Sequence, residues 1–569
     1  MFLCNGPTCL PSETSLFILY LFSIYSLFSI LYLHEQQSID SNMLADRASE
    51  SKQIYKIDPL IYKVPSLLFS EYLKPYLSEK EWKFLVFSCK HWKELVFIPL
   101  NRTYSIQFYQ NVEFRRRIYP KVVDTSRQLS LNLSFMKIPI REDDTLQNLY
   151  SLNLSRCQSL PKLDVFHNIT KLNLSRCLQI IELPQLPTVR NLNLTGCLNL
   201  RTIKYDMSHL ESIQLNGCTQ LTDVQNIKFV KDIDLSGCLG LSDVNCLWRA
   251  KRLILNECCK VSDVSKLGGI HTLYLSGCPL VSDISNLTEN YELNITNSPL
   301  IKDLRAVGRS VRKLNISECH QIEDISCLYS VTDLNISHCT QFRDHHVLSL
   351  LSPPLNHSSP AIKCIQLASC TQITNVFPLK DAKVVNISNC VEISQLPPDN
   401  RWSALQMSNC QKITDFSMLC GLYELVAMNC VQINDSDLEN FSNIRVLNLQ
   451  GCLGVTDVSP LSRVHDLNLS RCVNISRGVD LLGHVHTLNL SDCAQIEDVS
   501  ALTNNYSLNL SNCVKIREID ALRNIHELNL AHCPLICDVS ALVGVKVLYL
   551  YFNPQIRDIS MLKDCQIMI

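Results

Sequence analysis

A motif of about twenty residues recurs from Leu152 almost to the end of the 569-residue chain, and it constrains the fold more than any other feature. Each copy contains two apolar residues separated by one residue, most often Leu-x-Leu, and three residues later a small residue at what we call the ladder position, as in LNLSRC at residues 152–157. Eighteen of the twenty ladder residues are cysteine, and most steps between them are 20 or 21 residues. Such regularity predicts coils of equal length that stack in register and share one core. The ladder positions are Cys157, Cys177, Cys197, Cys218, Cys238, Cys258, Cys278, Ser298, Cys319, Cys339, Cys370, Cys390, Cys410, Cys430, Cys452, Cys472, Cys493, Cys513, Cys533 and Asn553.

The repeating unit, taken from Val485 onward, follows the pattern LxxLxLxxCxxIxDVSxL. It resembles the cysteine-containing leucine-rich repeats, and its second half resembles the short class, which has turns where longer repeats have helices. The resemblance implies a repeat solenoid of the α/β class, a horseshoe with about 20 parallel strands and a short, turn-rich convex side. Only stacked neighbours can bury the leucines of one coil, and each fully buried side chain stabilises the fold by about 1.5–3 kcal/mol.

The solenoid is predicted to occupy residues 129–569, with a weaker opening unit at residues 131–136. One step departs from the spacing: 31 residues separate Cys339 from Cys370, and the extra chain contains three prolines. We therefore expect an insertion at residues 342–361. Inserts in solenoids often contact partners, although simple sequence drift explains this one equally well.

The ladder cysteines are interpreted as buried structural thiols, because a small side chain must turn the chain and bond the backbone groups left inside. The array contains no C-x-x-C pairs and is expected in the cytosol, so metal and disulfide roles are disfavoured. Aspartate recurs five residues after thirteen of the twenty ladder positions, Asp498 among them. Turn capping explains these carboxylates better than a calcium ladder, whose Gly-rich repeat is missing. No cofactor is predicted.

The residue between the paired leucines is expected on the concave face, because side chains alternate along a strand. Asparagine fills this slot in twelve repeats, and stacked asparagines can bond to one another along the sheet without contributing to recognition. Specificity is then expected where the pattern breaks. Four successive repeats break it, and they supply the predicted target-binding residues Gln214, Asp234, Ile254 and Tyr274.

Upstream of the repeats, residues 60–100 have a helical periodicity, with Pro65 at a helix start, Ser78 as an N-cap and Pro99 at the end. The stretch VPSLLFSEYLKPYLSEKEWKFLVFSCKHWKELV resembles the F-box family, which implies a small helical module that docks on a Skp-type adaptor of a cullin ubiquitin ligase. The alternative is that these helices only cap the solenoid, with residues 101–128 as a linker or part of the cap. The residues that the resemblance assigns to adaptor binding are Val64, Pro65, Leu68, Leu77, Trp82, Leu85, Cys89, Lys90 and Trp92.

Residues 1–42 form an apolar extension in which Ser15–Leu33 is uncharged and long enough to cross a bilayer as a helix. No lysine or arginine precedes Arg47, which disfavours a cleaved signal peptide. Two interpretations remain: a membrane anchor that leaves the repeats in the cytosol, or a non-native extension upstream of a start at Met43. Both predict a cytoplasmic location for the repeats.

The charge balance and the lack of catalytic motifs bear on function. Lys plus Arg number 52 and Asp plus Glu 54, a net charge of -2, so no global field draws the chain to nucleic acid. No phosphate loop, nucleophile elbow or metal motif appears, and the recurring polar residues recur in every coil, so an enzyme is not expected. The sequence favours a substrate-recognition subunit of an F-box-type ubiquitin ligase that holds an unknown protein target. The alternatives are an interaction scaffold outside any ligase and a membrane-anchored leucine-rich-repeat receptor.

Overall fold

A computed structural model of the chain separates two compact units, Met1–Ile98 and Pro99–Ile569. All described residues belong to the second unit. No helix among them is long and apolar enough to cross a membrane. The structure describes residues 103–104, 130–136, 149–163, 169–350, 362–562 and 565–568.

Two predicted features lie outside the described residues: the apolar run Ser15–Leu33 and the F-box-like segment at residues 60–100. Their roles, and the cytoplasmic location inferred with them, stay predictions. The linker assigned to residues 101–128 contains a two-residue strand at Thr103–Tyr104, which pairs with the first strand of the repeats.

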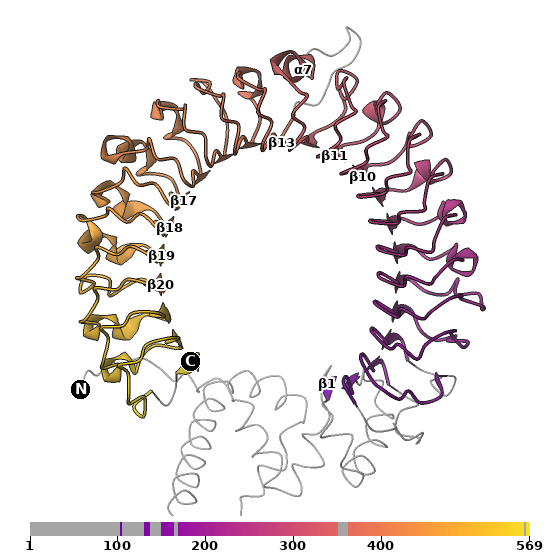
Figure 1. Ribbon diagram of the computed structural model, residues 1–569, viewed down its shortest axis with the longest axis horizontal. Coiled ribbons are helices and arrows are strands. Elements are labelled where there is room, and N and C mark those ends of the chain that lie inside the picture. Colours follow the sequence, from indigo (N-terminus) through magenta and orange to yellow (C-terminus); the bar gives the residue numbers. More distant parts are fainter. Residues whose placement is uncertain are drawn as a thin grey trace, which may run out of the picture. The chain divides into compact units, whose positions relative to one another are not determined.

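Twenty-three short strands of the described residues form one parallel sheet, and each strand pairs with the next one along the chain. Figure 1 shows the strands along the inner side of a curved array, with turns and short helices outside. The predicted leucine-rich-repeat solenoid with a turn-rich convex side is confirmed. The strands are β1 Thr103–Tyr104, β2 Ser130–Asn132, β3 Ser151–Asn153, β4 Lys171–Asn173, β5 Asn191–Asn193, β6 Ser212–Gln214, β7 Asp232–Asp234, β8 Arg252–Ile254, β9 Thr272–Tyr274, β10 Glu292–Asn294, β11 Lys313–Asn315, β12 Asp333–Asn335, β13 Cys364–Gln366, β14 Val384–Asn386, β15 Ala404–Gln406, β16 Glu424–Val426, β17 Val446–Asn448, β18 Asp466–Asn468, β19 Thr487–Asn489, β20 Ser507–Asn509, β21 Glu527–Asn529, β22 Val547–Tyr549 and β23 Gln566–Met568.

Each strand from β2 to β22 buries its middle residue, and the residue after the strand is buried as well. In β19, Leu488 and the following Leu490 are buried, while Thr487 is exposed and Asn489 is partly exposed. Leu488 is in register with Leu467 of β18 and with the equivalent leucine of β20, so the apolar rows run from coil to coil. The alternation of leucine and polar residues thus places the core between the sheet and the outer turns.

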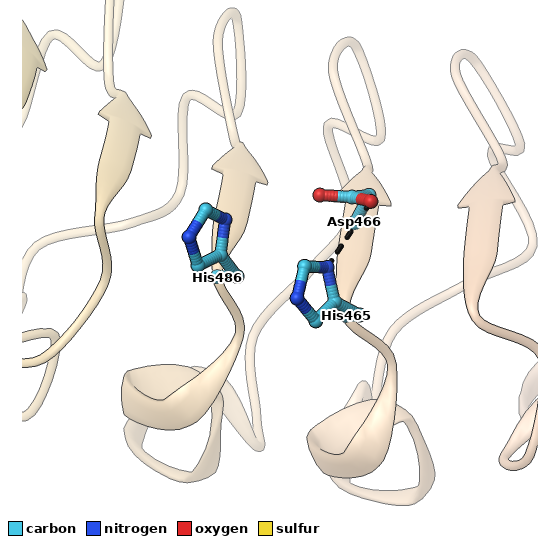
Figure 2. A group of neighbouring side chains, drawn as sticks. All are labelled: His465, Asp466 and His486. Carbon is cyan, nitrogen blue, oxygen red and sulfur yellow. Dashed lines mark ion pairs between the residues drawn. The ribbon is translucent and has the colours of Figure 1, made fainter.

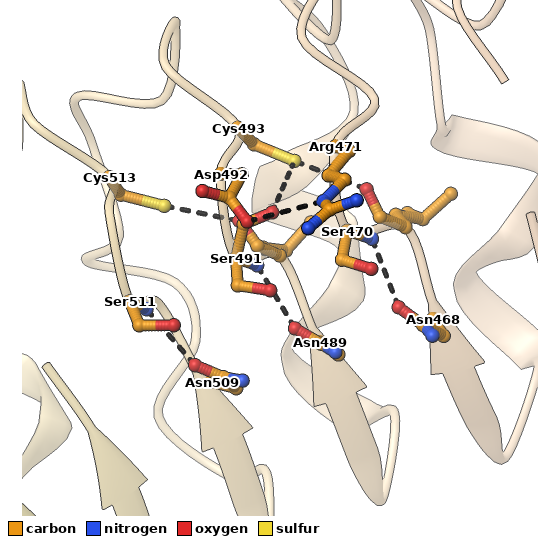
Figure 3. A network of polar contacts seen from close by, with 12 residues as sticks. Asn468, Ser470, Arg471, Asn489, Ser491, Asp492, Cys493, Asn509, Ser511 and Cys513 are labelled. Carbon is orange, nitrogen blue, oxygen red and sulfur yellow. Dashed lines mark hydrogen bonds and ion pairs between the residues drawn. The ribbon is translucent and has the colours of Figure 1, made fainter. Parts of the chain in front are cut away.

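The thiol ladder joins neighbouring coils. All eighteen ladder cysteines are buried, and each Sγ donates to the carbonyl oxygen of the residue that follows the strand of the preceding coil, at 3.0–3.3 Å. Figure 3 shows two members, Cys493 and Cys513. Every cysteine in the described ranges is a free thiol, and burial raises the pKa of Cys410 to about 12. The prediction of buried structural thiols is confirmed.

The two ladder positions without cysteine differ in the hydrogen bonds that their side chains form. Asn553 uses both ends of its amide: Nδ2 donates to the carbonyl of Leu530 at 2.7 Å, and Oδ1 accepts from the backbone N–H of Cys533 at 2.7 Å. Ser298 has a shorter side chain, and its buried Oγ has no hydrogen-bond partner. The ladder of side-chain bonds is therefore interrupted at Ser298.

The residue before each ladder position turns the chain in the left-handed region. Its φ is positive from Phe135 to Phe552, for example 57° at Arg156 and 75° at Gly217. Single residues can adopt this conformation at a cost of about 1–2 kcal/mol, and glycine adopts it without that cost. The sharp turn after every strand directs the ladder side chain back under the sheet.

The outer side of the coils is built from capped turns, as predicted. Eleven of the recurring aspartates accept a hydrogen bond from the backbone N–H two residues later, as Asp498 does from Ser500 at 2.8 Å. Asp344 and Asp435 differ, because they bond to the following coil, at Thr374 and Thr456. The other eleven carboxylates cap their own turns, as the sequence indicates.

Within the described ranges, one α-helix and eleven 3-10 helices lie on this outer side. The α-helix falls within the predicted insertion at residues 342–361, of which residues 351–361 lie outside the described ranges. The helices are η6 Gln225–Ile227, η7 Asn245–Leu247, η8 Leu267–Gly269, η9 Val307–Arg309, α7 Asp344–Ser349, η10 Phe377–Leu379, η11 Ser417–Leu419, η12 Asp435–Phe441, η13 Ser459–Arg463, η14 Val479–His484, η15 Asp520–Asn524 and η16 Ser540–Leu542.

Candidate functional site on the inner face of the sheet

The four residues predicted to bind a target lie side by side on strands β6 to β9. Gln214, Asp234, Ile254 and Tyr274 are successive register partners at the third position of these strands. Their exposure is unequal: Gln214 is exposed, whereas Ile254 is only 7% exposed. Ile254 therefore offers little surface as an anchor, and its expected part in the site stays a prediction.

Two of these side chains are held by neighbours. The Tyr274 hydroxyl donates to Oε1 of Glu292 at 2.7 Å, which fixes the ring. This hydrogen bond also raises the pKa of Tyr274. Asp234 accepts from the backbone N–H and the hydroxyl of Ser236, at 3.0 and 2.6 Å. Of the four residues, Gln214 thus has an exposed side chain that can adapt to a partner, whereas the Tyr274 ring is held in place.

The asparagine row bonds differently from the expected chain of asparagines. Asn489 Oδ1 accepts from the N–H of Ser491 at 3.0 Å, within its own turn, and Asn468 and Asn509 do the same (Figure 3). Thirteen asparagines share this arrangement. In the described part of the chain, none of their Nδ2 groups donates to a protein atom. The inner face therefore presents a row of unused amide donors.

A shallow hollow of about 250 Å³ lies on the inner face over strands β9 to β13. It begins at Tyr274 and contains Glu292, Lys313 and Asp333, which occupy the first position of three successive strands. Their charges alternate from strand to strand. The sequence-based prediction missed these residues because it weighed only the position between the leucines, although the first strand position borders the same face.

The residue directly before each strand forms a second row, which we call the pre-strand row. From β3 to β23 this row has twenty-one members, of which twelve are basic, four are tyrosine and one is acidic. The net charge of -2 hides this local concentration, so the predicted lack of a nucleic-acid partner stays untested. The basic members are Arg190, Lys231, Lys251, His271, Arg312, Lys363, Lys383, Arg445, His465, His486, His526 and Lys546.

Rings of this row stack where they adjoin. His465, His486, Tyr506 and His526 form a continuous stack with centroids 4.5–4.9 Å apart and planes within 13° of parallel.

The described residues hold one group of three side chains that could ligate a metal ion, and it lies at the start of this stack: His465, Asp466 and His486. Figure 2 shows the three side chains at two neighbouring strands.

Asp466 is the acidic member of this group. Its Oδ2 lies 3.1 Å from Nδ1 of His465. Burial raises the pKa of the Asp466 carboxyl, but the hydrogen bond from Thr487 and the neighbouring His465 outweigh this effect, and the pKa is lowered overall.

No protein family and no curated relative matches the chain. Among solved structures, the chain is similar to the TLR13–ssRNA13 complex, with 14% identity, 74% of this chain and 84% of that one covered, and a TM-score of 0.44. The mouse RP105/MD-1 complex shows 15% identity, 72% and 87% coverage and a TM-score of 0.38. A leucine-rich-repeat protein of Leptospira interrogans shows 17% identity, 67% and 95% coverage and a TM-score of 0.33. Likeness at these identities concerns the repeat fold and does not extend to a ligand.

Proposed function

We propose that the solenoid holds a protein target on its inner face, while the F-box-like segment recruits a Skp-type adaptor of a cullin ubiquitin ligase. The holding role rests on one observation: the inner face is a continuous parallel sheet with a row of unused asparagine donors. Neighbouring strands lie about 4.8 Å apart, so these donors form a closely spaced row that can meet several acceptors of one partner. The chain has no expected catalytic role, because its polar residues recur from coil to coil instead of gathering at one site.

The target site is proposed over β6 to β12, where the break in the asparagine row adjoins the charged hollow. Tyr274 joins the two regions, and its hydroxyl bond to Glu292 restrains the ring before any partner binds. Pre-organised aromatic side chains carry much of the energy of protein interfaces. A partner with complementary alternating charge would match Glu292, Lys313 and Asp333.

The target site is tested by comparing Tyr274→Ala with Trp248→Ala. Trp248 is exposed and follows helix η7 on the outer side, so it is a matched aromatic control. A target that co-purifies with the wild-type chain should be weakened at least about tenfold by Tyr274→Ala, or roughly 1.4 kcal/mol, and should be retained by Trp248→Ala. Equal retention by both variants contradicts a target site at Tyr274.

The ligase role is tested with a purified Skp-type adaptor. Wild-type chain should retain the adaptor, whereas Leu68→Asp and Trp92→Ala should lose it, because both substitutions fall on the F-box-like segment. Tyr274→Ala is the control and should retain the adaptor. If the wild-type chain retains none, the ligase role is wrong and the chain acts as an interaction scaffold outside the ligase.

The receptor alternative makes a separate prediction about glycans. Asn153-Leu154-Ser155 is one of several Asn-Leu-Ser sequons, and here Oδ1 of Asn153 accepts a hydrogen bond from the N–H of Ser155 at 3.0 Å. A folded cytosolic chain should carry no sugar at these asparagines. Glycans found on them in protein from its native source would favour the receptor over the ligase subunit.

A further inference from the structure

Two histidines meet a carboxylate at one place in the pre-strand row. His465 and His486 are the only neighbouring histidines among the described members of this row, and Asp466 follows the first of them. One ligand atom from each residue can be chosen so that all three lie within 4.8 Å of one another. Two imidazoles and a carboxylate suit zinc and other divalent transition metals.

The backbone holds the two histidines in fixed relation. The His465 carbonyl accepts from the N–H groups of His486 and Thr487, at 2.9 and 3.1 Å. The coils therefore cannot separate at this point without breaking the sheet. A ligand set whose backbone is fixed in advance loses little conformational entropy when an ion binds.

The ring nitrogens of the two histidines form few hydrogen bonds with the protein. Nδ1 of His465 is buried and makes no hydrogen bond of good geometry, although Oδ2 of Asp466 lies 3.1 Å away. The imidazole of His486 is exposed, and its Nδ1 has only the Thr487 hydroxyl nearby, at 3.3 Å. A buried nitrogen, a carboxylate oxygen beside it and an exposed imidazole opposite thus offer three ligand atoms close together.

We propose that His465, Asp466 and His486 bind a divalent transition metal such as Zn²⁺, which bridges the coils of β18 and β19. Metal–ligand bonds of about 2.0–2.2 Å place two ligand atoms about 3.3 Å apart in a tetrahedral site. The exposed His486 ring reaches this distance by turning about its own side-chain bonds, which tilts it out of the parallel stack with His465. Water completes the coordination.

The test uses the untagged full-length chain and isothermal titration with Zn²⁺, with Mg²⁺ for comparison. Zn²⁺ should bind and raise the unfolding temperature, because a ligand that binds only the folded state stabilises it. His486→Ala and Asp466→Asn should each weaken binding at least about tenfold, corresponding to roughly 1.4 kcal/mol. His526→Ala is the matched control: His526 also stacks on Tyr506 but has no neighbouring histidine, and the variant should bind as the wild type does.

Thiols are the competing zinc ligands, so the titrations use a background in which the exposed thiols of the described residues, Cys259, Cys420 and Cys537, and the three cysteines outside these residues, Cys4, Cys9 and Cys89, are replaced by serine. Co²⁺ then reports the ligand type, because thiolate ligation gives an intense charge-transfer band that histidine and carboxylate ligation lacks. Binding without this band, lost in His486→Ala, supports the site. Absence of binding, a thiolate band that persists in His486→Ala, or equal loss in His526→Ala overturns the proposal.

Discussion

At the scale of single residues, the ladder shows what one sulfur atom contributes. A buried cysteine packs as a small hydrophobe, and its Sγ also reaches the carbonyl of the preceding coil. Ser298 occupies the same slot, is fully buried and leaves its hydroxyl unpaired. An unpaired buried hydroxyl costs about 1–3 kcal/mol, so Ser298 is a weak point of the solenoid.

Replacing Ser298 with cysteine should therefore stabilise the chain by about 1 kcal/mol. The longer side chain should donate to the carbonyl of Leu275, as the neighbouring ladder thiols do in their coils. Urea unfolding of wild type and Ser298→Cys measures the difference. Ser298→Ala is the control, since it removes the unpaired hydroxyl without restoring a bond, and it should gain less. A cysteine variant no more stable than wild type would contradict this account of the ladder.

Burial should also suppress the reactivity of the ladder thiols. Thiolates are the reactive form, and burial holds the pKa of Cys410 at about 12, far above that of a free thiol. Cys420 lies ten residues later and is exposed. Brief alkylation of the folded chain at pH 8, followed by peptide mass spectrometry, should modify Cys420 and spare Cys410. In urea both should react, and comparable rates in the folded chain would show that the ladder opens readily.

At the scale of the single turn, the sequence predicted some hydrogen bonds correctly and others not. The aspartate caps were predictable because the donor lies two residues ahead in the same turn, as Ser500 does for Asp498. The asparagines were expected to bond across strands, but Asn489 also has a nearer donor two residues ahead. A local partner costs less entropy than one on another coil, and this preference was overlooked for the inner face.

The aspartate caps make stability depend on pH. Hydrogen bonds from the backbone N–H and hydroxyl of Ser265 lower the pKa of Asp263 below its unfolded value. The carboxylate therefore stabilises the fold above a pH of about 4 and loses this contribution as the pH falls through its lower folded pKa. Asp263→Ala should lower the unfolding temperature at pH 7 and reduce its fall below pH 4. Asp263→Asn is the control, because an amide still caps the turn, as Asn375 does for Phe377.

Asp263→Asn should stay close to wild type at pH 7 and share the weaker acid dependence of Asp263→Ala. Thermal unfolding followed by circular dichroism between pH 2 and pH 7 separates the two effects. If Asp263→Asn were as unstable as Asp263→Ala at pH 7, negative charge rather than the hydrogen bond would be the stabilising feature.

The outer turns also contain places where only glycine fits. A Cβ on Gly308 in helix η9 would lie 2.1 Å from the carbonyl oxygen of Cys327 in the next coil. Gly308→Ala should therefore destabilise the chain by about 2 kcal/mol or more, because backbone atoms must move. Gly269 of η8 has no heavy atom within 4 Å of its Cβ position, so Gly269→Ala should change stability by less than about 0.5 kcal/mol. Urea unfolding of both variants measures their free energies of unfolding. A similar loss of stability in the two variants would mean that neighbouring coils do not approach this closely at Gly308.

At the scale of the whole molecule, regularity made the solenoid predictable. Every coil repeats the same residue pattern, so the positions of the strands, the core leucines and the buried thiols could all be predicted from it. The features specific to single coils were harder to predict. The burial of Ile254 depends on its neighbours across the sheet. The charges of Glu292, Lys313 and Asp333 form one group only because their strands are neighbours in the sheet. The pre-strand row was missed because a balanced total charge says nothing about where the charges lie.

A solenoid also predicts how the chain tolerates the loss of a coil. Each coil contacts chiefly its two neighbours, so stability is nearly a sum of coil and interface contributions. Deleting residues 391–410 removes one complete coil with strand β15 and leaves Cys390 in the ladder place of Cys410. We expect this variant to fold, with an unfolding midpoint slightly below that of wild type.

Deleting only residues 391–400 is the matched control with half the loss of chain. It removes the core residues Ile393 and Leu396 but keeps strand β15, so the shortened coil cannot reach around the core and the ladder shifts by half a repeat. Circular dichroism, limited proteolysis and small-angle X-ray scattering should show a folded, curved particle for the longer deletion and a broken array for the shorter one. Because the larger deletion should be the milder one, damage that simply grew with the number of residues removed would contradict stacking of equal coils.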